Sequence, residues 1–386
     1  MSDPLEHGSP RDVGGPVESM APQAASDATP LVTVLIPVHN GARTLGAAAR
    51  SAFAQRYPAL EFLLLDDGSR DDSPAIGQAL VTEDARARWA SNGRNLGLAA
   101  TLNRGFSLAQ GTLVLVLHQD CALDGTDWIA RAVTLLRDPS VLVVSGSARH
   151  DVARMGRREK EFWIVRQHVA TASEARRGSV DATPLFSENK CDLFRRAELL
   201  ALGGFDERLR EGGEDQVLAW RLASSRWRVD FRSDLTYTIT LAQDERLSPH
   251  LRREASYGRQ MRQILSITRG GAVRRSPGGR SDPRLTNRVA AILWILVSLG
   301  GLVALAVTQE PWLLVFVLGP PAVRWVQLAA RAGSVKAEYR LSEYEVAATA
   351  GVGLLADLAY AWGTVSPAPR SARAPSEAAP GPPPAS

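Results

Sequence analysis

An uncharged apolar run in the last third of the chain, VAAILWILVSLGGLVALAV, extends from Val289 to Val307. These nineteen residues match the roughly 20 apolar residues with which a helix crosses the hydrocarbon core of a bilayer. A fully buried core helix is the alternative, and this length without a charge disfavours it. The run therefore predicts a chain that is attached to a membrane.

Two further apolar segments follow, and each contains an interruption. WLLVFVLGPPAVRWVQLAA includes the pair Pro320-Pro321 and Arg324, whose side chain can snorkel to a membrane interface. VAATAGVGLLADLAYAWGTV includes one acid, Asp357. We therefore expect two to three transmembrane helices within residues 289–365.

The stretch before the first apolar run is strongly basic. From His250 to Arg288 it carries ten arginines and only two acids. Because an excess of arginine and lysine marks the cytoplasmic side of a membrane helix, we interpret residues 251–288 as a basic juxtamembrane segment. This predicts a multi-pass protein of the cytoplasmic membrane whose N-terminal domain lies in the cytoplasm.

The N-terminal domain shows an alternation of strand and helix patterns. Continuous apolar runs, typical of strands buried on both faces, lie at residues 31–38, 61–65, 113–117 and 141–145. Helix patterns lie between them, at residues 44–57 and 96–110. Strands that alternate with helices predict an α/β domain with a mostly parallel sheet, which we place at residues 31–250.

Composition narrows the classes of function. A formal net charge of +4 is too weak to indicate nucleic-acid binding, and two cysteines, Cys121 and Cys191, make no disulfide framework. Residues 1–30 lack the apolar core of a signal peptide. They and residues 366–386 are rich in Pro, Ala and Ser, so we expect both ends to be disordered.

Polar residues directly follow two of the predicted strands. Asp66 and Asp67 end the run EFLLL, and His118 and Asp120 end the run TLVLVL. Since ligands of parallel α/β sheets bind beyond the C-terminal ends of the strands, we expect both groups on one rim. Each group is ambiguous alone, because DDGS is typical of a turn, a post-strand aspartate often caps a helix and a single histidine is more often structural.

A third acidic group precedes a predicted helix. Glu214 and Asp215 come just before the apolar positions Val217 and Leu218. Acids at this place also favour a helix N-terminus through the helix dipole, so this group is ambiguous alone as well.

Together and in this order, these stretches resemble family 2 glycosyltransferases, which have the GT-A fold. The resemblance runs through VTVLIPVHNGARTLGAAARSAFAQRYPALEFLLLDDGSRDDSP, NGRNLGLAATLNRGFSLAQGTLVLVLHQD and GGFDERLREGGEDQVLAWRL. It covers roughly residues 31–241. The trailing hydrophobic segments are similar to those of membrane-anchored bacterial members, so the resemblance implies a Rossmann-like GT-A domain followed by transmembrane helices.

The resemblance implies roles for the residues of the rim. The donor nucleotide would lie against Pro37, Asn40, Asp66, Asp67, Arg94 and Asn95. Asp67 would contact the base or ribose, with Asp66 in support. Asp120 matches the last acid of the family's DxD motif, which holds a divalent cation, Mg²⁺ or Mn²⁺, against the diphosphate. His118 stands in place of the first acid and is a secondary candidate ligand.

On the acceptor side, Asp215 matches the family's catalytic base and Glu214 its acidic neighbour. Many relatives also carry a histidine after the last strand of the domain, where it can assist the metal. This chain has YTITLAQDERLSPH there, so Thr238 or Thr240 takes that place. Both departures from the family pattern concern the metal more than the transfer itself.

The implied reaction moves a sugar from a nucleotide-diphosphate sugar to a hydroxyl of a lipid-linked or cell-envelope acceptor, with inversion in one displacement. A carboxylate must take the acceptor proton in the transition state, and a cation offsets the charge on the leaving diphosphate.

A non-catalytic nucleotide-sugar-binding scaffold on the same fold is the alternative. It is less favoured because Asp67, Asp120 and Asp215 are all present. A nucleotidyltransferase is disfavoured, because no Gly-rich phosphate loop followed by a basic residue opens the domain.

Overall fold

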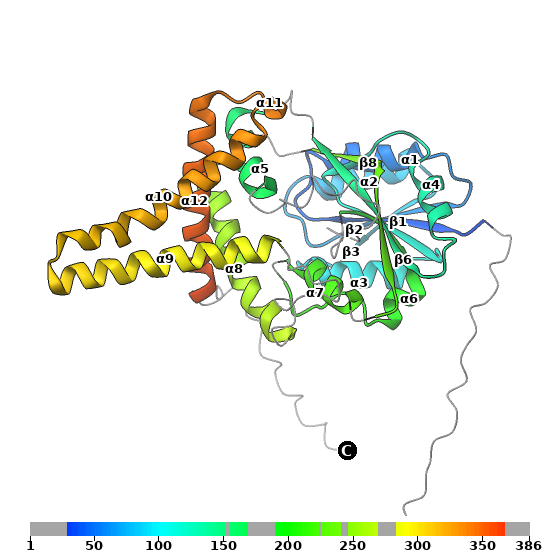
Figure 1. The fold of residues 1–386 in the computed structure, drawn as a ribbon. Coiled ribbons are helices and arrows are strands. Elements are labelled where there is room, and N and C mark those ends of the chain that lie inside the picture. Colours follow the sequence, from blue (N-terminus) through cyan, green and yellow to red (C-terminus); the bar gives the residue numbers. More distant parts are fainter. Residues whose placement is uncertain are drawn as a thin grey trace, which may run out of the picture.

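The computed structural model describes residues 29–150, 155–168, 190–210, 212–223, 225–240, 246–268 and 283–366. Figure 1 shows an α/β domain next to a group of long helices. The predicted α/β class with apolar C-terminal helices is therefore confirmed. The ends expected to be disordered, 1–30 and 366–386, lie almost entirely outside the described residues.

One mixed sheet forms the centre of the domain. Its strands are β1 (Val32–Val38), β2 (Leu60–Asp66), β3 (Ala87–Ser91), β4 (Leu113–Leu117), β5 (Cys121–Leu123), β6 (Val141–His150), β7 (Cys191–Arg195) and β8 (Arg228–Ile239). Within the described residues their order is β3-β2-β1-β4-β7-β6-β8-β5. The half made of β3, β2, β1 and β4 is parallel, whereas β7 runs antiparallel to β4 and β6.

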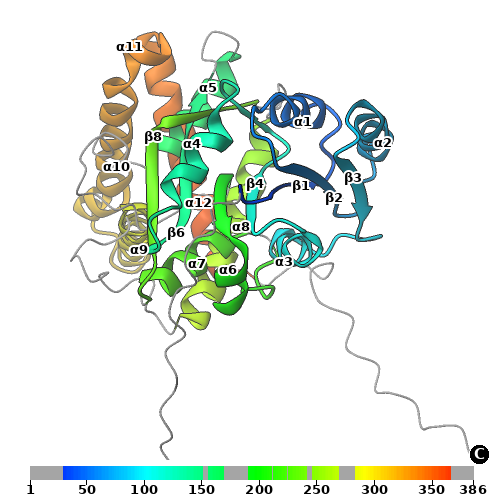
Figure 2. The same ribbon diagram turned by 90° about the vertical axis from the view of Figure 1, so that its right-hand side faces the viewer.

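Helices cover both faces of the sheet (Figure 2). They are α1 (Leu45–Phe53), α2 (Ser73–Glu83), α3 (Leu98–Leu108), α4 (Trp128–Leu135), α6 (Arg196–Ala201) and α7 (Glu214–Ala223). In β1, Val34 and Ile36 pack against α1 and α2, while Leu35 packs against α3. All seven residues of β1 are buried, which explains why this strand is an unbroken apolar run.

The remaining helices form a second layer. They are α5 (Arg157–His168), α8 (Leu247–Ile267), α9 (Pro283–Thr308), the short 3₁₀ turn η2 (Pro311–Leu313), α10 (Leu314–Ser334), α11 (Lys336–Tyr339) and α12 (Glu343–Val365). α8 packs along α12, and α9 pairs with α10 as a hairpin that projects away from the sheet (Figure 1). Ala332, Val335 and Val346 belong to the same apolar cluster as β1, so this layer is continuous with the domain.

By length and composition, two described helical segments can cross a membrane, namely Pro311–Ser334 and Glu343–Val365. The described part of α9 adds a shorter apolar helix, Ile292–Thr308. The two long segments differ in burial: 17% of the apolar window is buried in the first and 44% in the second. The first thus resembles a lipid-facing helix more closely than the second.

Arg324, whose side chain could snorkel to an interface alone, is instead paired with an acid of another helix. Arg324 is only 3% exposed, and its Nε lies 2.9 Å from Oδ2 of Asp357, which is 1% exposed. The charges that interrupt the second and third apolar segments therefore pair with each other. Each of these two residues needs a partner of opposite charge, because an unpaired buried charge is strongly destabilising. The other residue, which is distant in the sequence, supplies it.

The segment expected to be a basic juxtamembrane stretch, 251–288, begins inside α8. This helix lies so close to α12 that a Cβ on Gly363 would sit 1.8 Å from the backbone oxygen of Ala255. A Cβ on Gly258 would likewise sit 2.1 Å from the oxygen of Tyr360. Glycine at both positions allows this contact, and the basic stretch is thus part of the folded helical layer up to Ile267.

Candidate active site

Three neighbouring parallel strands, β2, β1 and β4, end at one rim of the sheet. The turns that follow them carry predicted site residues: Asn40 after β1, Asp66-Asp67 after β2, and His118 with Asp120 after β4. In the strand register, Val38 of β1 lies opposite Asp66 of β2. The fold therefore gathers at one edge residues that are far apart in the sequence.

Asp67 is held by three hydrogen bonds from one loop. Its Oδ1 accepts from the backbone N of Leu96 at 2.7 Å and from Nδ2 of Asn92 at 2.9 Å, and its Oδ2 accepts from the backbone N of Gly97 at 3.0 Å. The residue is only 5% exposed. Asp67 thus fixes the loop 92–97, which leads into α3.

Asp66 connects the turn after β2 to the end of β3. Its Oδ1 accepts from the backbone N of Ser69, and its Oδ2 accepts from Oγ of Ser91, both at 3.0 Å. Asp66 is also buried. Its expected support of Asp67 stays a prediction, and the contacts show that each of the two acids holds a different part of the rim.

Asn40 joins the turns after β1 and β2. It adopts a left-handed backbone conformation, with φ of 49°. Its backbone N donates to Oγ of Ser69 at 3.0 Å, and its Oδ1 accepts from the backbone N of Arg70 at 2.8 Å. Pro37, the other candidate from β1, is buried inside the strand opposite Leu65.

Arg94 and Asn95 lie in the exposed loop that Asp67 holds. Nδ2 of Asn95 is 3.2 Å from Nε2 of His39. The turn after β2 passes so close beneath the loop that a Cβ on Gly68 would lie 2.5 Å from the carbonyl carbon of Arg94. Gly68 also has a φ of 71°, so glycine is required there on both grounds. The two predicted residues are thus displayed at the surface of the rim.

Gln119, the middle residue of the HQD triplet, joins the turns after β1 and β4. Its Nε2 donates to the backbone O of His39, and its Oε1 accepts from the backbone N of His39, both at 2.9 Å. Gly41 leaves room for this side chain, since a Cβ there would lie 2.1 Å from Oε1 of Gln119. Nothing in the sequence marks Gln119 as a site residue, because its importance lies in a contact with a turn that is distant in the chain.

The two candidate metal ligands, His118 and Asp120, are half-buried at the end of β4. The backbone O of Asp120 accepts from the backbone N of Thr240 at 2.7 Å. Thr238 instead donates through Oγ1 to Asp124 at 2.8 Å. Of the two threonines considered in place of the family histidine, Thr240 is therefore the neighbour of Asp120.

Within the described residues, no group of three or more His, Cys, Asp or Glu side chains is placed to hold a metal ion. Mg²⁺ commonly keeps several waters and binds through one or two carboxylates together with substrate phosphates. A half-buried carboxylate at the rim, Asp120, fits that kind of cation site. It does not fit a metal held by protein ligands alone.

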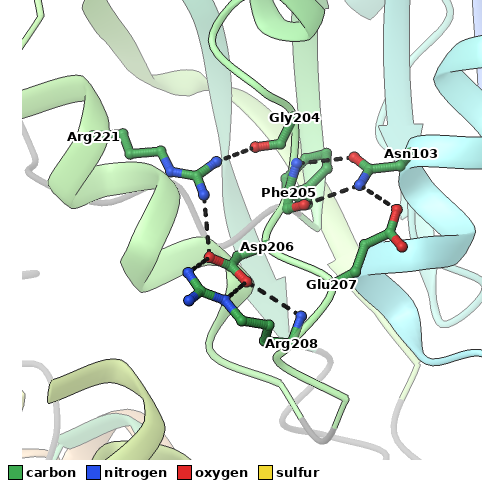
Figure 3. Close-up of polar contacts among 7 residues, drawn as sticks. All are labelled: Asn103, Gly204, Phe205, Asp206, Glu207, Arg208 and Arg221. Atoms are coloured by element: carbon green, nitrogen blue, oxygen red, sulfur yellow. Dashed lines mark hydrogen bonds and ion pairs between the residues drawn. The ribbon is translucent and has the colours of Figure 1, made fainter. Parts of the chain in front are cut away.

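A second loop, which contains Gly204, Phe205 and Asp206, is hydrogen-bonded to both α3 and α7 (Figure 3). Asn103 of α3 exchanges two hydrogen bonds of 2.9 Å with the backbone of Phe205. Arg221 of α7 donates to the backbone O of Gly204 at 2.8 Å and to Oδ2 of Asp206 at 3.1 Å. The turn of the GGFDE stretch is therefore fixed from both sides.

Asp206 carries a further ion pair, with Arg208 at 2.6 Å. The hydrogen bond from the Arg208 guanidinium lowers the pKa of Asp206. The loop then reaches the rim, because a Cβ on Gly97 would lie 3.1 Å from the backbone O of Arg210. The amide of Gly97 also binds Asp67, so one residue contacts both the acids of the rim and the loop that leads to α7.

Glu214 and Asp215 begin α7 after two glycines with left-handed backbones, Gly212 and Gly213. Glu214 is 5% exposed, and its burial raises the pKa of its carboxyl group. Its Oε2 makes no hydrogen bond within the described residues. Asp215 is half-buried, and its Oδ1 accepts from the backbone N of Gln216 at 2.8 Å. The two adjacent acids therefore have different environments.

Comparison with known proteins agrees with this geometry. Residues 33–196 match the family model "Glycosyl transferase family 2". An uncharacterized glycosyltransferase of Haemophilus influenzae is 34% identical over 91 residues, which cover 24% of this chain and 36% of that protein. The succinoglycan biosynthesis protein ExoO of Rhizobium meliloti is 35% identical over 96 residues, or 25% and 27% of the two chains. The chain thus spans about a third of the length of these relatives.

Among solved structures, the chain resembles the mannosyltransferase PcManGT from Pyrobaculum calidifontis, which was solved in complex with GDP-Man and Mn²⁺. The TM-score is 0.53 at 19% sequence identity, and the match covers 86% of this chain and 88% of the other. At this identity, the likeness concerns the fold.

Proposed function

We propose that this chain, whose residues 33–196 match the family model "Glycosyl transferase family 2", transfers a sugar from a nucleotide-diphosphate sugar to a hydroxyl acceptor, with inversion at the anomeric carbon. The observation that carries the proposal is the meeting of the acidic rim and the acceptor-side loop at Gly97. One compact region then holds both donor and acceptor.

The donor binds over the rim formed by β2, β1 and β4. Arg94 and Asn95 are displayed there for the donor, while Asn40, Asp66 and Asp67 hold the turns beneath it. PcManGT, which shares the fold, binds GDP-Man and Mn²⁺, and this supports a nucleotide-sugar donor and a divalent cation for this chain. Asp120 would hold the cation, which offsets the negative charge of the leaving diphosphate.

Asp215 acts as the general base. An acceptor hydroxyl is a poor nucleophile, so a carboxylate must take its proton as the new bond forms. Asp215 is half-buried at the first turn of α7, whereas its neighbour Glu214 is buried and has a raised pKa. Of the two acids, Asp215 is therefore the one that is accessible to an acceptor, and Glu214 lies behind it on the acceptor side.

The acceptor is a membrane lipid or a cell-envelope glycan, and the catalytic domain lies at the cytoplasmic face. The apolar helices Pro311–Ser334 and Glu343–Val365 support attachment to a membrane. The basic stretch that precedes α9 supports a cytoplasmic catalytic domain. The relative ExoO is named for the biosynthesis of succinoglycan, which supports a glycan product.

The test is release of free nucleoside diphosphate from a panel of nucleotide sugars by the full chain in membranes, with and without a membrane lipid extract. We expect one donor to be consumed, with faster release when the lipid extract is present. Asp215→Asn should bind that donor and release nothing. Binding without release in the native chain for every donor would instead favour the non-catalytic scaffold.

A further inference from the structure

Exposed apolar side chains are concentrated in the helical layer. Of the large hydrophobic residues that are exposed in the described part of the chain, only Leu108 and Leu200 precede residue 293. The others lie on α9, η2, α10 and α12, and Val303, Val307 and Trp312 are each more than 60% exposed. A surface of this kind marks contact with a membrane or a partner.

The α9 arm of the α9–α10 hairpin is long enough to cross a bilayer, and a shorter uncharged stretch follows it in the other arm. From Val289 to Gln309 the sequence has no charged residue, and from Pro311 to Val323 it has none again. Nineteen apolar residues in α9 rise by about 28 Å at 1.5 Å per residue, close to the thickness of the hydrocarbon core. At the tip stand the polar residues Gln309 and Glu310, together with Trp312, a residue type that is enriched at membrane–water interfaces.

α12 presents its apolar surface differently. Between residues 346 and 365 its only exposed residues are Leu355, Leu358, Trp362 and Val365. Their spacing of three, four and three places them in one stripe along the helix. Tyr360 and Gly363, which contact α8, lie on the opposite side of the helix. The exposed stripe therefore faces away from α8.

α8 decides how α12 can lie in a membrane. The two helices touch at the backbone near Gly258 and Gly363. α8 carries the arginines Arg252, Arg253, Arg259 and Arg262. If α12 crossed the bilayer, it would carry these four side chains into the hydrocarbon, where arginine is costly. If α12 lies along the surface, the same arginines stay at the level of anionic lipid headgroups, which attract them.

From these observations we propose that α9 and α10 cross the bilayer as a hairpin, while α12 lies in the plane of the cytoplasmic surface with its Leu355–Val365 stripe among the acyl chains. The partner is a bilayer with anionic headgroups. The C-terminal end of the chain then lies on the same side as the catalytic domain. This inference rests on the membrane attachment in the proposed function, and it adds the number of spans and their arrangement.

The course of the helices fits this arrangement. α9 runs crosswise to α12, and the tip of the hairpin projects beyond α12 on the side away from the sheet (Figures 1 and 2). The Arg324–Asp357 ion pair joins α10 to α12. With α12 at the surface, this pair lies at interfacial depth, and the catalytic domain stands directly above the headgroups that would surround a lipid acceptor.

Spin-label depth measurements test the position of α12. Cysteines introduced one at a time by Leu355→Cys, Leu358→Cys, Trp362→Cys and Val365→Cys are labelled in the full chain in anionic liposomes. The native Cys121 and Cys191 are 1% exposed and can stay. An in-plane helix gives four equal depths, whereas a spanning helix gives a gradient of about 15 Å over these ten residues. Leu296→Cys, Val303→Cys and Val307→Cys on α9 serve as the matched set, which should show such a gradient.

Accessibility to a membrane-impermeant maleimide in intact cells tests the crossing. We expect Gln309→Cys to react, and Ser386→Cys to stay protected like the catalytic-domain control Ser107→Cys. Reaction at Ser386→Cys, or a depth gradient along α12, would overturn the in-plane assignment. Protection of Gln309→Cys would overturn the crossing, and recovery of the full chain from the soluble fraction would overturn membrane attachment itself. Neither measurement uses sugar transfer, so its outcome is separate from that of the enzymatic proposal.

Discussion

The carboxylates on the proposed donor side and on the proposed acceptor side of the site have opposite environments. On the donor side, Asp67 accepts three hydrogen bonds from the loop 92–97 and Asp66 accepts two from its own surroundings. On the acceptor side, Glu214 is buried, its pKa is raised by burial, and its Oε2 has no hydrogen bond within the described residues. The acids at the end of β2 therefore fix the loops of the rim, whereas Glu214 keeps an oxygen that makes no hydrogen bond within the described residues.

The difference has a physical cause. A carboxylate that accepts several backbone N–H bonds fixes the loop that donates them, so the donor surface is organised before the substrate arrives. A base must instead keep an oxygen available for the acceptor proton. The exclusion of water that raises the pKa of Glu214 also lowers the local dielectric constant, which strengthens electrostatic interactions at that place. Substitutions on the two sides should therefore differ in whether they lower turnover, donor affinity or stability.

Asp215→Asn is expected to have the largest effect. The amide keeps the shape but cannot take the acceptor proton, so we expect turnover to fall by roughly 10³-fold or more, at the upper end of general-base effects. The affinity for the donor should stay within about two-fold, since the base acts only in the transition state. Nucleoside diphosphate release and calorimetric titration with donor measure the two quantities. Equal losses in both would move Asp215 to the donor side.

Asp120→Ala and His118→Ala should differ in severity. Loss of Asp120 removes the carboxylate that fits the cation, and we expect a fall of roughly 10²-fold or more. Loss of His118 should cost about ten-fold, the equivalent of one hydrogen bond. His118→Asp should be tolerated and shift the preference toward Mg²⁺, because imidazole suits Mn²⁺ better than Mg²⁺. Rates with both metals compare the variants, and equal damage from the two alanines would make His118 a primary ligand.

Asp67→Ala should act on stability as much as on rate. It leaves the amides of Leu96 and Gly97 and the side chain of Asn92 without their acceptor, and we expect a loss of about 2–4 kcal/mol from unsatisfied buried donors. Asp66→Ala, which removes the acceptor of two hydrogen bonds, is the matched control and should lose less folding free energy. Thermal unfolding of the full chain in detergent gives the comparison. An unchanged melting temperature in Asp67→Ala would show that the loop is held by other contacts.

Gln119 offers a finer test of the donor side. Gln119→Ala removes both hydrogen bonds to His39, and we expect the KM for the donor to rise by about ten-fold with a smaller change in kcat, as for loss of a hydrogen-bonded positioning residue. Gln119→Glu can still accept from the His39 amide but cannot donate, so its KM for the donor should lie between those of the native chain and Gln119→Ala. Steady-state kinetics of the three proteins measure this order. A change confined to kcat would place Gln119 with the reacting groups.

Glu214→Gln should have the smallest effect, and the effect depends on pH. Because burial raises the pKa of Glu214 in the folded state, its protonated form stabilises the fold at pH values below the unfolded pKa, and this contribution is lost as pH rises through the folded pKa. The variant cannot ionise, so its melting temperature should decline less than that of the native chain over this rise. Parallel curves would show that Glu214 is paired in the folded protein.

Much of the fold can be predicted from the sequence, because buried strands and helices leave recognisable patterns of apolar residues. The runs at β1, β2 and β4 are continuous and apolar since these strands lie inside a sheet that helices cover on both faces. The family resemblance of residues 33–196 and the GT-A-like fold are confirmed, and the transfer reaction is the proposal that rests on them. The assigned roles of single residues stay predictions.

The positions of the polar residues at the strand ends can be predicted from the chain alone, because the rule that ligands bind beyond the C-terminal ends of parallel strands needs only the order of elements. Their hydrogen-bond and ion-pair partners become known only in the folded molecule. Gln119 with His39, Asn103 with Phe205, and Arg324 with Asp357 are pairs whose members lie far apart in the chain. A hydrogen bond or ion pair depends on distance and direction between atoms, and neither hydropathy nor spacing along the chain encodes which distant segment will supply the second atom.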